Sequence, residues 1–375
     1  MATQQHDNRV TRYPRDWASV RPARPEDVSA IQNIYKEVYK GTFSYLEYTD
    51  AGFLRHDMAN GHSNWYVLES NISHLICGCV SVLVDPGSWK AYSRGMMLRP
   101  AWQGYGGTSR LFGTVFQHIL QRYKGQLRIV WGEARSASIK PQAVAESIGM
   151  KPVGILPGKD VFFGRRETAV IMAVYSTAAW RARDTNVTLV AKLEPLYRHT
   201  QGMFKAMSKD RVEIRENPSF ASDYCPCSVD VTSLEGAFGY TEYTFSCRDT
   251  KSTLSITVNK QCLNAEHMEL RCSEPEVART LLQSMIDHLG GKGIQFIEGK
   301  CPANSPEMQD AFLLAGMQPL GYLPAWNKDV ASGLDVDQVV FGWKCRSIDR
   351  KTTALSSTAT ALARVCFEDE WGSIS

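Results

Sequence analysis

The chain repeats one of its own segments. Residues 147–157, SIGMKPVGILP, recur as LAGMQPLGYLP at 314–324, which places Gly316 opposite Gly149 at an offset of 167 positions. The same offset aligns VWGEARSAS at 130–138 with IEGKCPANS at 297–305 without a gap. Because Gly, Met and Pro stay in step over this length, a chance match is improbable, and we expect two copies of one fold.

The two copies differ in one place. Upstream, MMLRP at 96–100 aligns with MELRC at 268–272, so the second copy is five residues shorter between these segments and the repeat. The missing residues belong to RPAWQGYGGTSRLF at 99–112, a glycine-rich stretch between a predicted strand and a predicted helix. Glycines at a helix N-terminus let a phosphate approach the backbone. Since the second copy lacks them, we expect them to serve a ligand rather than the fold.

The pattern of apolar residues predicts the order β-α-β-β-β-loop-α-β-α-β over about 160 residues that begin near residue 20, an α/β class with a mixed sheet. The segment between the copies reads as a helix broken near Pro195 that docks one lobe on the other. In order, the predicted parts are a flexible arm, a first domain with the glycine loop, a helical connector, a second domain without the loop, and a C-terminal tail: 1–17, 18–177, 178–209, 210–347 and 348–375.

The glycine stretch does not fit two common phosphate loops. A Walker loop needs Lys after its last glycine, whereas Gly107 is followed by Thr108, and a Rossmann fingerprint needs a third glycine where Ser109 stands. The stretch instead resembles the acetyl-CoA signature of the GNAT N-acetyltransferase superfamily. Gln103, Gly106 and Thr108 occupy the three defining places of that signature, with Thr108 in place of the usual Gly or Ala.

Two further segments resemble the same superfamily. VRPARPEDVSAI at 20–31 resembles its opening strand and helix, and AVAESIGM at 143–150 resembles its helix that ends in Gly-Phe. The resemblance covers about residues 20–175 and implies an acyl-CoA N-acyltransferase fold. The whole chain resembles tandem GNAT proteins in architecture, with a degenerate second copy.

The resemblance implies that acetyl-CoA is the bound substrate and that no metal is needed. The backbone N–H groups of the loop would hold the pyrophosphate, and the backbone at the end of the preceding strand would pair with the pantetheine. Tyr105 is expected to point to solvent rather than onto the adenine. The predicted contact residues are Leu98, Arg99, Gln103, Gly104, Tyr105, Gly106, Gly107 and Thr108.

Acyl transfer needs a general base for the amine and an acid for the departing thiolate. The usual acid of the superfamily is a tyrosine at the place where this chain has Ala145. For the base we predict Glu133, at the end of an apolar strand; the second copy has Lys300 there. The alternative is a structural ion pair of Glu133 with Arg128 or Arg135. Tyr92 is the second catalytic candidate, and its alternative is a tyrosine packed in the core.

The charged hairpin KDVFFGRRE at 159–167 is interpreted either as a substrate-recognition loop or as a solvated turn. The histidines at 56 and 62 lie where this fold receives its acceptor, and surface histidines are the alternative. The cysteines of CGC are expected on one face of a strand, buried and reduced.

The sequence therefore predicts a cytoplasmic N-acyltransferase that moves an acetyl group from acetyl-CoA to the amine of a small molecule or peptide by direct attack. A net charge of +3 gives no argument for nucleic acid, and no run is long and apolar enough for a membrane. Two alternatives stay open: an acyl-CoA decarboxylase or acyl-carrier loading module, and a non-catalytic CoA-binding scaffold. A homodimer is left open as well.

Overall fold

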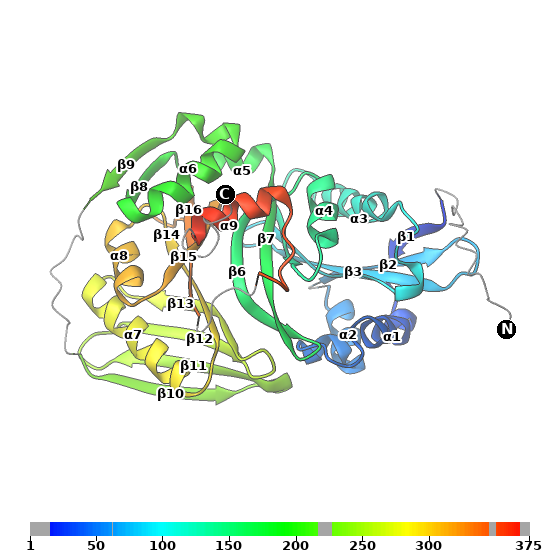
Figure 1. Ribbon diagram of the computed structural model, residues 1–375, viewed down its shortest axis with the longest axis horizontal. Coiled ribbons are helices and arrows are strands. Elements are labelled where there is room, and N and C mark those ends of the chain that lie inside the picture. The colour runs from blue at the N-terminus through cyan, green and yellow to red at the C-terminus, as the bar shows by residue number, and fades with distance from the viewer. Residues whose placement is uncertain (1–15, 62, 217–226, 345–349, 368–375) are drawn as a thin grey trace, which may run out of the picture.

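The computed structural model describes residues 16–61, 63–216, 227–344 and 350–367. One sheet of 14 strands runs through the whole molecule, in the order β1-β2-β3-β4-β5-β7-β6-β15-β16-β14-β13-β12-β11-β10 (Figure 1). The predicted mixed α/β class is confirmed by this order, because the sheet contains both parallel and antiparallel pairs. Most of the predicted arm, His62 and the last eight residues of the predicted tail lie outside the described residues.

The first lobe supplies the strands from β1 to β7 and four α-helices. Its elements are β1 (Ala18–Pro22), η1 (Pro25–Asp27), α1 (Val28–Tyr39), η2 (Leu46–Thr49), α2 (Ala51–Ala59), β2 (Ser63–Ser70), β3 (Ile76–Asp85), β4 (Lys90–Leu98), η3 (Pro100–Trp102), α3 (Thr108–Arg122), β5 (Ile129–Arg135), α4 (Lys140–Ser147), β6 (Lys151–Phe162) and β7 (Arg165–Tyr175). The helix α2 was not predicted from the sequence.

A connector and the second lobe follow. The connector holds α5 (Thr177–Ala182), β8 (Asn186–Val190), η4 (Ala191–Leu193), α6 (Glu194–Met203), η5 (Lys205–Lys209) and β9 (Arg211–Arg215). The second lobe and the tail hold β10 (Val229–Glu235), η6 (Ala237–Gly239), β11 (Tyr240–Cys247), β12 (Thr253–Asn259), β13 (Asn264–Arg271), α7 (Pro275–Gly291), β14 (Phe296–Pro302), α8 (Pro306–Leu314), β15 (Gln318–Lys328), β16 (Asp335–Lys344) and α9 (Ser357–Cys366).

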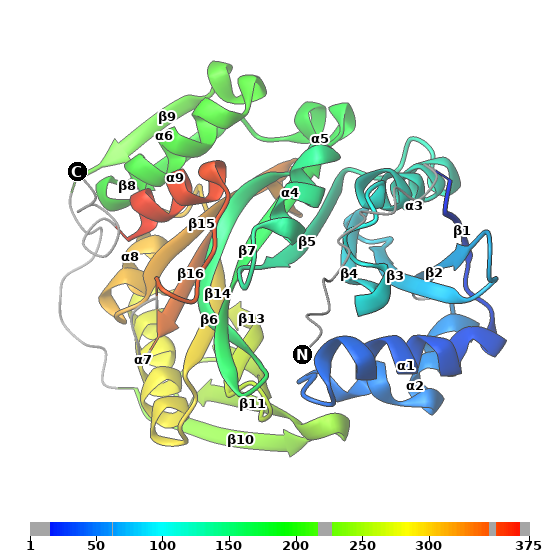
Figure 2. The ribbon, with the colours of Figure 1, turned by 45° about the vertical axis from the view of Figure 1, so that its right-hand side comes forward.

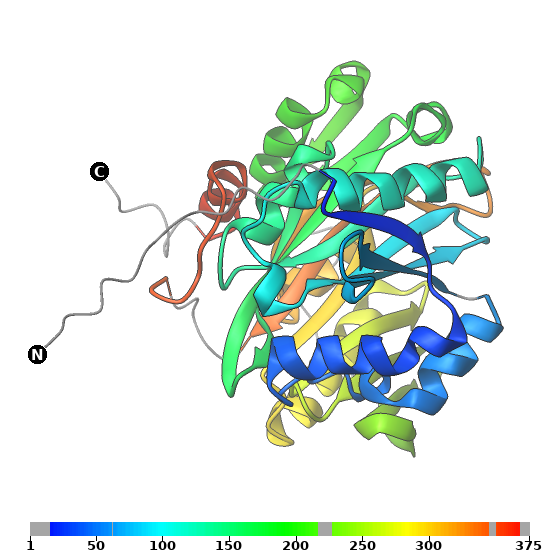
Figure 3. The ribbon, with the colours of Figure 1, turned by 90° about the vertical axis from the view of Figure 1, so that its right-hand side faces the viewer.

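Helices cover both faces of the first lobe's strands. Val28, Ile31 and Ile34 repeat at helical spacing on α1 and are fully buried against one face. The helix α3 covers the opposite face with Leu111 and Val115. Figure 3 shows α1 and α2 on one side of these strands and α3 on the other. In the part of the chain that the structure describes, no helix combines the length and the apolar character needed to cross a membrane.

The strand order of the second lobe mirrors that of the first. The run β13-α7-β14-α8-β15-β16 repeats the run β4-α3-β5-α4-β6-β7, and both contain one parallel pair. The two halves meet where β6 pairs with β15, at Gly154 opposite Gly321. These glycines are separated by the offset of the sequence repeat, so the mirror point of the sheet lies on equivalent residues.

The junction needs glycine for steric reasons. A Cβ added at Gly321 would lie 2.5 Å from the Cα of Gly154 and 2.5 Å from the carbonyl oxygen of Val153. Both atoms belong to the backbone of the neighbouring strand, which has no rotamer to change. The close approach of β6 and β15 therefore depends on the missing side chain at residue 321.

One core joins the lobes. Its buried apolar residues include Ile155 of the first lobe, Leu189 and Tyr197 of the connector, and Phe296 and Tyr322 of the second lobe. The helices α6 and α9 pack over the central strands β6 and β15, as Figure 2 shows. The predicted break near Pro195 is wrong, because Pro195 lies in the first turn of α6, where its missing N–H costs nothing.

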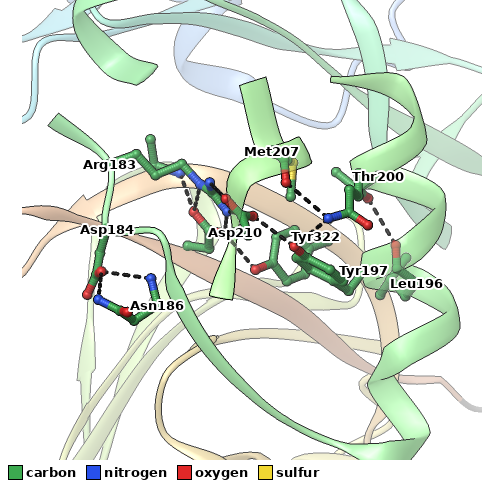
Figure 4. A network of polar contacts seen from close by, with 12 residues as sticks. Arg183, Asp184, Asn186, Leu196, Tyr197, Thr200, Met207, Asp210 and Tyr322 are labelled. Atoms are coloured by element: carbon green, nitrogen blue, oxygen red, sulfur yellow. Dashed lines mark hydrogen bonds and ion pairs between the residues drawn. The ribbon is translucent and has the colours of Figure 1, made fainter. Parts of the chain in front are cut away.

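The connector is fixed to the second lobe by a buried arginine (Figure 4). The guanidinium of Arg183 donates to both carboxylate oxygens of Asp210, at 2.7 Å, and of Asp337, at 2.7 and 2.5 Å. The hydroxyl groups of Tyr197 and Tyr322 donate to the same two carboxylates, at 2.8 and 2.6 Å. Since a buried charge is tolerated only when it is paired, this network requires connector and lobe together.

The two cysteines of CGC lie on opposite faces of β3 rather than on one face. Cys77 belongs to the core under α3, and Cys79 belongs to the core under α1. The cause is a β-bulge, because the register of β2 and β3 shifts between Leu68 and Glu69 and leaves Cys77 without a partner in the pairing.

We expect Gly321→Ala to destabilise the full chain by about 1–3 kcal/mol, because the new methyl group forces β6 and β15 apart. The control is Gly202→Ala on α6, where an added Cβ meets nothing within 4 Å. That change should be neutral or stabilising by up to ~1 kcal/mol. Denaturant unfolding measures both, and equal effects of the two substitutions would contradict the steric account of the junction.

Candidate functional site

The glycine loop has an open, left-handed backbone. The φ angles of Gly104, Gly106 and Gly107 are 92°, 78° and 73°, and α3 begins at the next residue, Thr108. A Cβ added at Gly104 or Gly106 would meet nothing within 4 Å. The N-cap residue of α3 is Gly107, which has no side chain that could cap the helix. The loop thus combines an accessible surface with a helix N-terminus, which is what an anionic group needs.

The strands on either side of the loop diverge. β4 and β5 pair in parallel from Lys90–Ser93 and Ile129–Gly132, and no further pair between them occurs in the described residues. β4 then continues to Leu98 and β5 to Arg135. We call the region between the separated parts of β4 and β5 the wedge: the glycine loop follows the end of β4, and Glu133 is the first residue of β5 beyond the paired part.

Aromatic rings pack against the loop. The Trp17 ring stacks on that of Trp102 with centroids 5.4 Å apart, and its Nε1–H donates to the carbonyl of Gly106 at 3.0 Å. Tyr105 meets both rings edge-on, at 6.0 and 5.6 Å. The expected exposure of Tyr105 to solvent is therefore wrong, because this half-buried ring is part of the packing that fixes the loop.

The remaining predicted contact residues lie at the mouth of the wedge. The Gln103 side chain donates to the carbonyl oxygen of Leu98 at 3.0 Å. The backbone N–H of Arg99 donates to the carbonyl of Cys77 at 2.9 Å, and its side chain pairs with Glu37 at 2.8 Å. The Arg99 N–H is thus engaged within the sheet, whereas the Leu98 carbonyl is held only by a side chain.

Side chains pack closely in the corresponding wedge of the second lobe. β13 and β14 also pair over a short parallel stretch and then separate. A Cβ added at Gly299 in that wedge would lie 2.8 Å from the Phe312 ring and 2.9 Å from the Met268 sulfur. The side chains of Phe312 and Met268 therefore lie close against the backbone of β14 where it separates from β13.

Glu133 lies in a buried ionic cluster shared by the two lobes. Its two carboxylate oxygens each accept a hydrogen bond from the Lys159 ammonium at 2.8 Å. The same ammonium lies 2.8 Å from Oε2 of Glu266 and 3.7 Å from Oε2 of Glu298. The Lys159 side chain is only 3% exposed. The Lys159 ammonium thus lies among three carboxylates, one from the first lobe and two from the second, and Glu298 also pairs with Lys300.

The partners predicted for a structural Glu133 are engaged elsewhere. Arg128 forms an ion pair with Asp335, and Arg135 binds Glu167 through two hydrogen bonds of 2.6 and 2.8 Å. Lys159 takes their place, so the identity of the predicted ion-pair partner was wrong. Lys159 begins the hairpin segment, and its burial also makes the solvated-turn interpretation wrong at this residue.

Burial and competition for the ammonium set the protonation of the cluster. Burial, together with the neighbouring carboxylates, outweighs the attraction of Lys159 and raises the pKa of Glu133 to about 7. Burial also opposes ionisation of Glu298, but Lys300 and Lys159 overcome it and lower the pKa of Glu298 to about 2. The Lys159 pKa stays well above its ordinary value despite burial, since several carboxylates surround it.

Tyr92 lies on β4 beside Glu133, and its ring stacks on Trp131 with centroids 4.2 Å apart. Burial, followed by the charge of Glu133, raises the pKa of Tyr92 well above its ordinary value. At neutral pH its hydroxyl is therefore a proton donor and not a base. Ala145, at the place where the sequence resemblance expects the acid, lies on α4 and is buried in the core that α3 and α4 share.

Residues that sequence reasoning missed come from the second lobe. Glu266 and Glu298 reach Lys159, and the Tyr240 hydroxyl donates to Oε1 of Glu47 at 2.9 Å. The repeat alignment held a usable signal, because it places Glu266 opposite Arg94 and Glu298 opposite Trp131. A carboxylate that replaces a cation or an indole at an equivalent strand position indicates a change of role.

The segment that follows α1 packs against the second lobe. The Asn259 side chain donates to the carbonyl of Ser44 at 3.3 Å, and the rings of Phe53 and Phe238 meet edge-on at 5.9 Å. His56, by contrast, is exposed, and its Nε2 bonds to the side chain of Asn60, the residue that follows α2, at 2.7 Å. Within the described ranges, no three Cys, His, Asp or Glu side chains are grouped as ligands of a metal ion.

No family model matches this chain, and a search of curated proteins returns no match. Solved structures resemble part of it. A spermidine N-acetyltransferase chimera of Vibrio cholerae is 17% identical, with 43% of this chain and 96% of that chain covered and a TM-score of 0.36. A ribosomal L7/L12 α-N-protein acetyltransferase in complex with coenzyme A is 18% identical, with coverages of 42% and 94% and a TM-score of 0.36.

A third structure, the ribosomal-protein-S5-alanine acetyltransferase of Vibrio fischeri, is 13% identical, with coverages of 43% and 94% and a TM-score of 0.37. Each match covers less than half of this chain. Conclusions about the chemistry of the site therefore rest on its own geometry.

The raised pKa of Glu133 predicts a dependence of stability on pH. Between pH 4.5 and about 7 the carboxyl ionises in the unfolded chain before it ionises in the folded one, so unfolding becomes easier as pH rises. The free energy of unfolding of the wild type should thus fall as pH rises, and we expect Glu133→Gln to remove up to about 3 kcal/mol of this fall. Denaturant unfolding at pH 5 and pH 7.5 measures it, and identical slopes for both proteins would show that Glu133 ionises normally.

Proposed function

We propose that the protein is an N-acetyltransferase in which the first lobe binds acetyl-CoA and an acceptor amine reaches the acetyl group from the side of the second lobe. The observation that carries this proposal is the open glycine loop at the N-terminus of α3, from which the wedge between β4 and β5 leads to Glu133. The signature carried by Gln103, Gly106 and Thr108 supports the same assignment.

The pyrophosphate of CoA would lie over Gly104–Gly107, where the backbone is open and the helix dipole favours an anion. The pantetheine would follow the unpaired edge of β4 into the wedge. Its amide would take over the Leu98 carbonyl that the Gln103 side chain now occupies. The thioester would then lie near Glu133 and Tyr92.

In the reaction, the amine nitrogen attacks the thioester carbonyl, the C–N bond forms and the C–S bond breaks. The amine proton passes to Glu133, whose pKa of about 7 suits a general base at neutral pH. The departing thiolate takes a proton from Tyr92 or from water. A cysteine intermediate is not favoured, because burial raises the pKa of Cys77 and of Cys79 to about 12.

We further propose that the second lobe is a copy that has lost its cofactor site. The shorter loop in the sequence supports this, together with the packing of Phe312 and Met268 against Gly299. Its role would be to complete the acceptor side of the cleft, for which the contact between Tyr240 and Glu47 is the supporting observation.

A non-catalytic CoA-binding scaffold is the second candidate. Two observations favour it: Ala145 replaces the usual acid, and both oxygens of Glu133 are held by Lys159. A scaffold would bind acetyl-CoA without turnover, whereas the transferase releases CoA when a suitable amine is present.

For binding, we expect Gly106→Asp to abolish acetyl-CoA binding, because a carboxylate would stand where the pyrophosphate lies and the left-handed φ disfavours a side chain. Calorimetry should show one site per wild-type chain. Gly333→Asp is the matched control, since Gly333 also has a positive φ of 72° and open surroundings. Unchanged affinity in the Gly106 variant, or two sites per chain, would overturn the assignment.

For catalysis, we expect Glu133→Gln to lower the rate by about 10²–10⁴ at neutral pH, because the amide cannot accept the proton. The assay measures CoA release from acetyl-CoA with 1,4-diaminobutane, lysine and a short peptide as acceptor probes. Glu167→Gln is the control, since Glu167 lies on the adjacent strand and pairs with Arg135. Wild-type rates in the Glu133 variant would return Glu133 to a structural role.

A further inference from the structure

The cluster around Lys159 divides one positive charge among carboxylates of both lobes. Lys159 follows the junction on β6, Glu133 lies on β5, and Glu266 lies on β13 across the lobe boundary. The ammonium lies at 2.8 Å from both oxygens of Glu133 and at 2.8 Å from Oε2 of Glu266, so the two carboxyl groups compete for it. A base that accepts a proton from an amine must not be neutralised by a permanent ion pair.

Glu266 occupies a position that carries a cation in the other copy. The repeat places it opposite Arg94, whose guanidinium donates to Ser81 at 3.0 Å and to Ser63 at 2.7 Å within the first lobe. The second lobe therefore presents a carboxylate to the catalytic side of the first lobe at a point where its own fold does not require one. Glu266 is nine-tenths buried and its carboxylate is held by Lys159.

We propose that Glu266 is a positioning residue for Glu133: it holds the Lys159 ammonium across the lobe boundary and thereby leaves the Glu133 carboxylate able to accept the proton of the acceptor amine. The inference rests on the proposed role of Glu133 as base. It gives the second lobe a direct part in the chemistry of the first, beyond completing the walls of a cleft.

The electrostatics agree with this geometry. Glu266 keeps a lowered pKa against the effect of burial because of Lys159, so it stays ionised and retains its hold on the ammonium. Its charge is also among the causes that raise the pKa of Glu133. Other charged or titratable side chains also interact electrostatically with Glu133 or with the groups around it. They are Tyr45, Tyr92, Asp160, His267, Glu298 and Lys300.

The test follows the protonation of Glu133 directly and needs no acceptor. Carboxyl bands are recorded by infrared spectroscopy during a pH titration of the full chain. The difference between wild type and Glu133→Gln isolates the transition of Glu133 near pH 7. The difference between Glu266→Gln and the double variant with Glu133→Gln and Glu266→Gln isolates the ionisation of Glu133 in the absence of the Glu266 charge. Glu266→Gln keeps the shape of the side chain and removes only its charge.

We expect Glu266→Gln to lower the midpoint of Glu133 by about one pH unit or more, because Lys159 then serves Glu133 and a repelling charge is gone. Glu167→Gln, which removes a carboxylate bound to Arg135 instead, should leave the midpoint unchanged. A midpoint in Glu266→Gln within ~0.3 unit of wild type overturns the proposal. Lys159→Met, if that variant folds, should shift the midpoint of Glu133 in the opposite direction, to higher pH.

The acid limb of kcat/KM should move with the midpoint, for whichever amine probe is turned over, while the KM for acetyl-CoA stays constant. A merely structural role of Glu266 would not shift this limb. The two proposals fail separately. Full activity of Glu133→Gln contradicts the base, whereas an inactive Glu133→Gln together with an unmoved midpoint in Glu266→Gln contradicts only the positioning role.

Discussion

The buried ammonium of Lys159 is the interaction on which the site depends. A charge that is 97% removed from solvent costs several kcal/mol unless carboxylates surround it closely, and the three nearest ones lie on β5, β13 and β14. None of these strands alone could hold the ammonium in place. The lobes must therefore be in register before the cluster can form, and any error in that register leaves a charge unpaired. This requirement links the local chemistry of Glu133 to the assembly of the whole sheet.

The register itself comes from the junction of β6 and β15. Gly154 and Gly321 face each other at equivalent positions of the repeat, so the sheet continues from one copy into the other with mirrored strand order. Three further features stabilise that arrangement: the shared core, the Arg183 network, and the helices α6 and α9 that pack over β6 and β15. As a result the glycine loop of the first lobe and the Lys159 cluster have fixed relative positions, which the proposed reaction between two bound substrates would need.

The sequence predicts the parts of this arrangement that depend on local chain conformation. The left-handed glycines of the loop, the helix after it and the repeated strands follow from residue pattern alone, because each needs only its neighbours in sequence. The cluster could not be predicted in the same way. Lys159 reads as part of a charged hairpin, and only the tertiary structure brings it to Glu133 and Glu266. Cys77 and Cys79 lie on opposite faces of β3 because of a β-bulge that the sequence pattern does not reveal. The packing of Tyr105 depends on Trp17, which is distant in sequence.

The central claim is that Glu133 and Glu266 share one ammonium across the lobe boundary. A double-mutant cycle of unfolding free energies with Glu133→Gln and Glu266→Gln tests it most directly. When one carboxylate is absent, the other becomes the main partner of Lys159, so the account predicts that the double variant loses about 1 kcal/mol or more beyond the sum of the single effects. Additive effects, within ~0.3 kcal/mol, would show that the two carboxylates do not share Lys159 and would contradict the account.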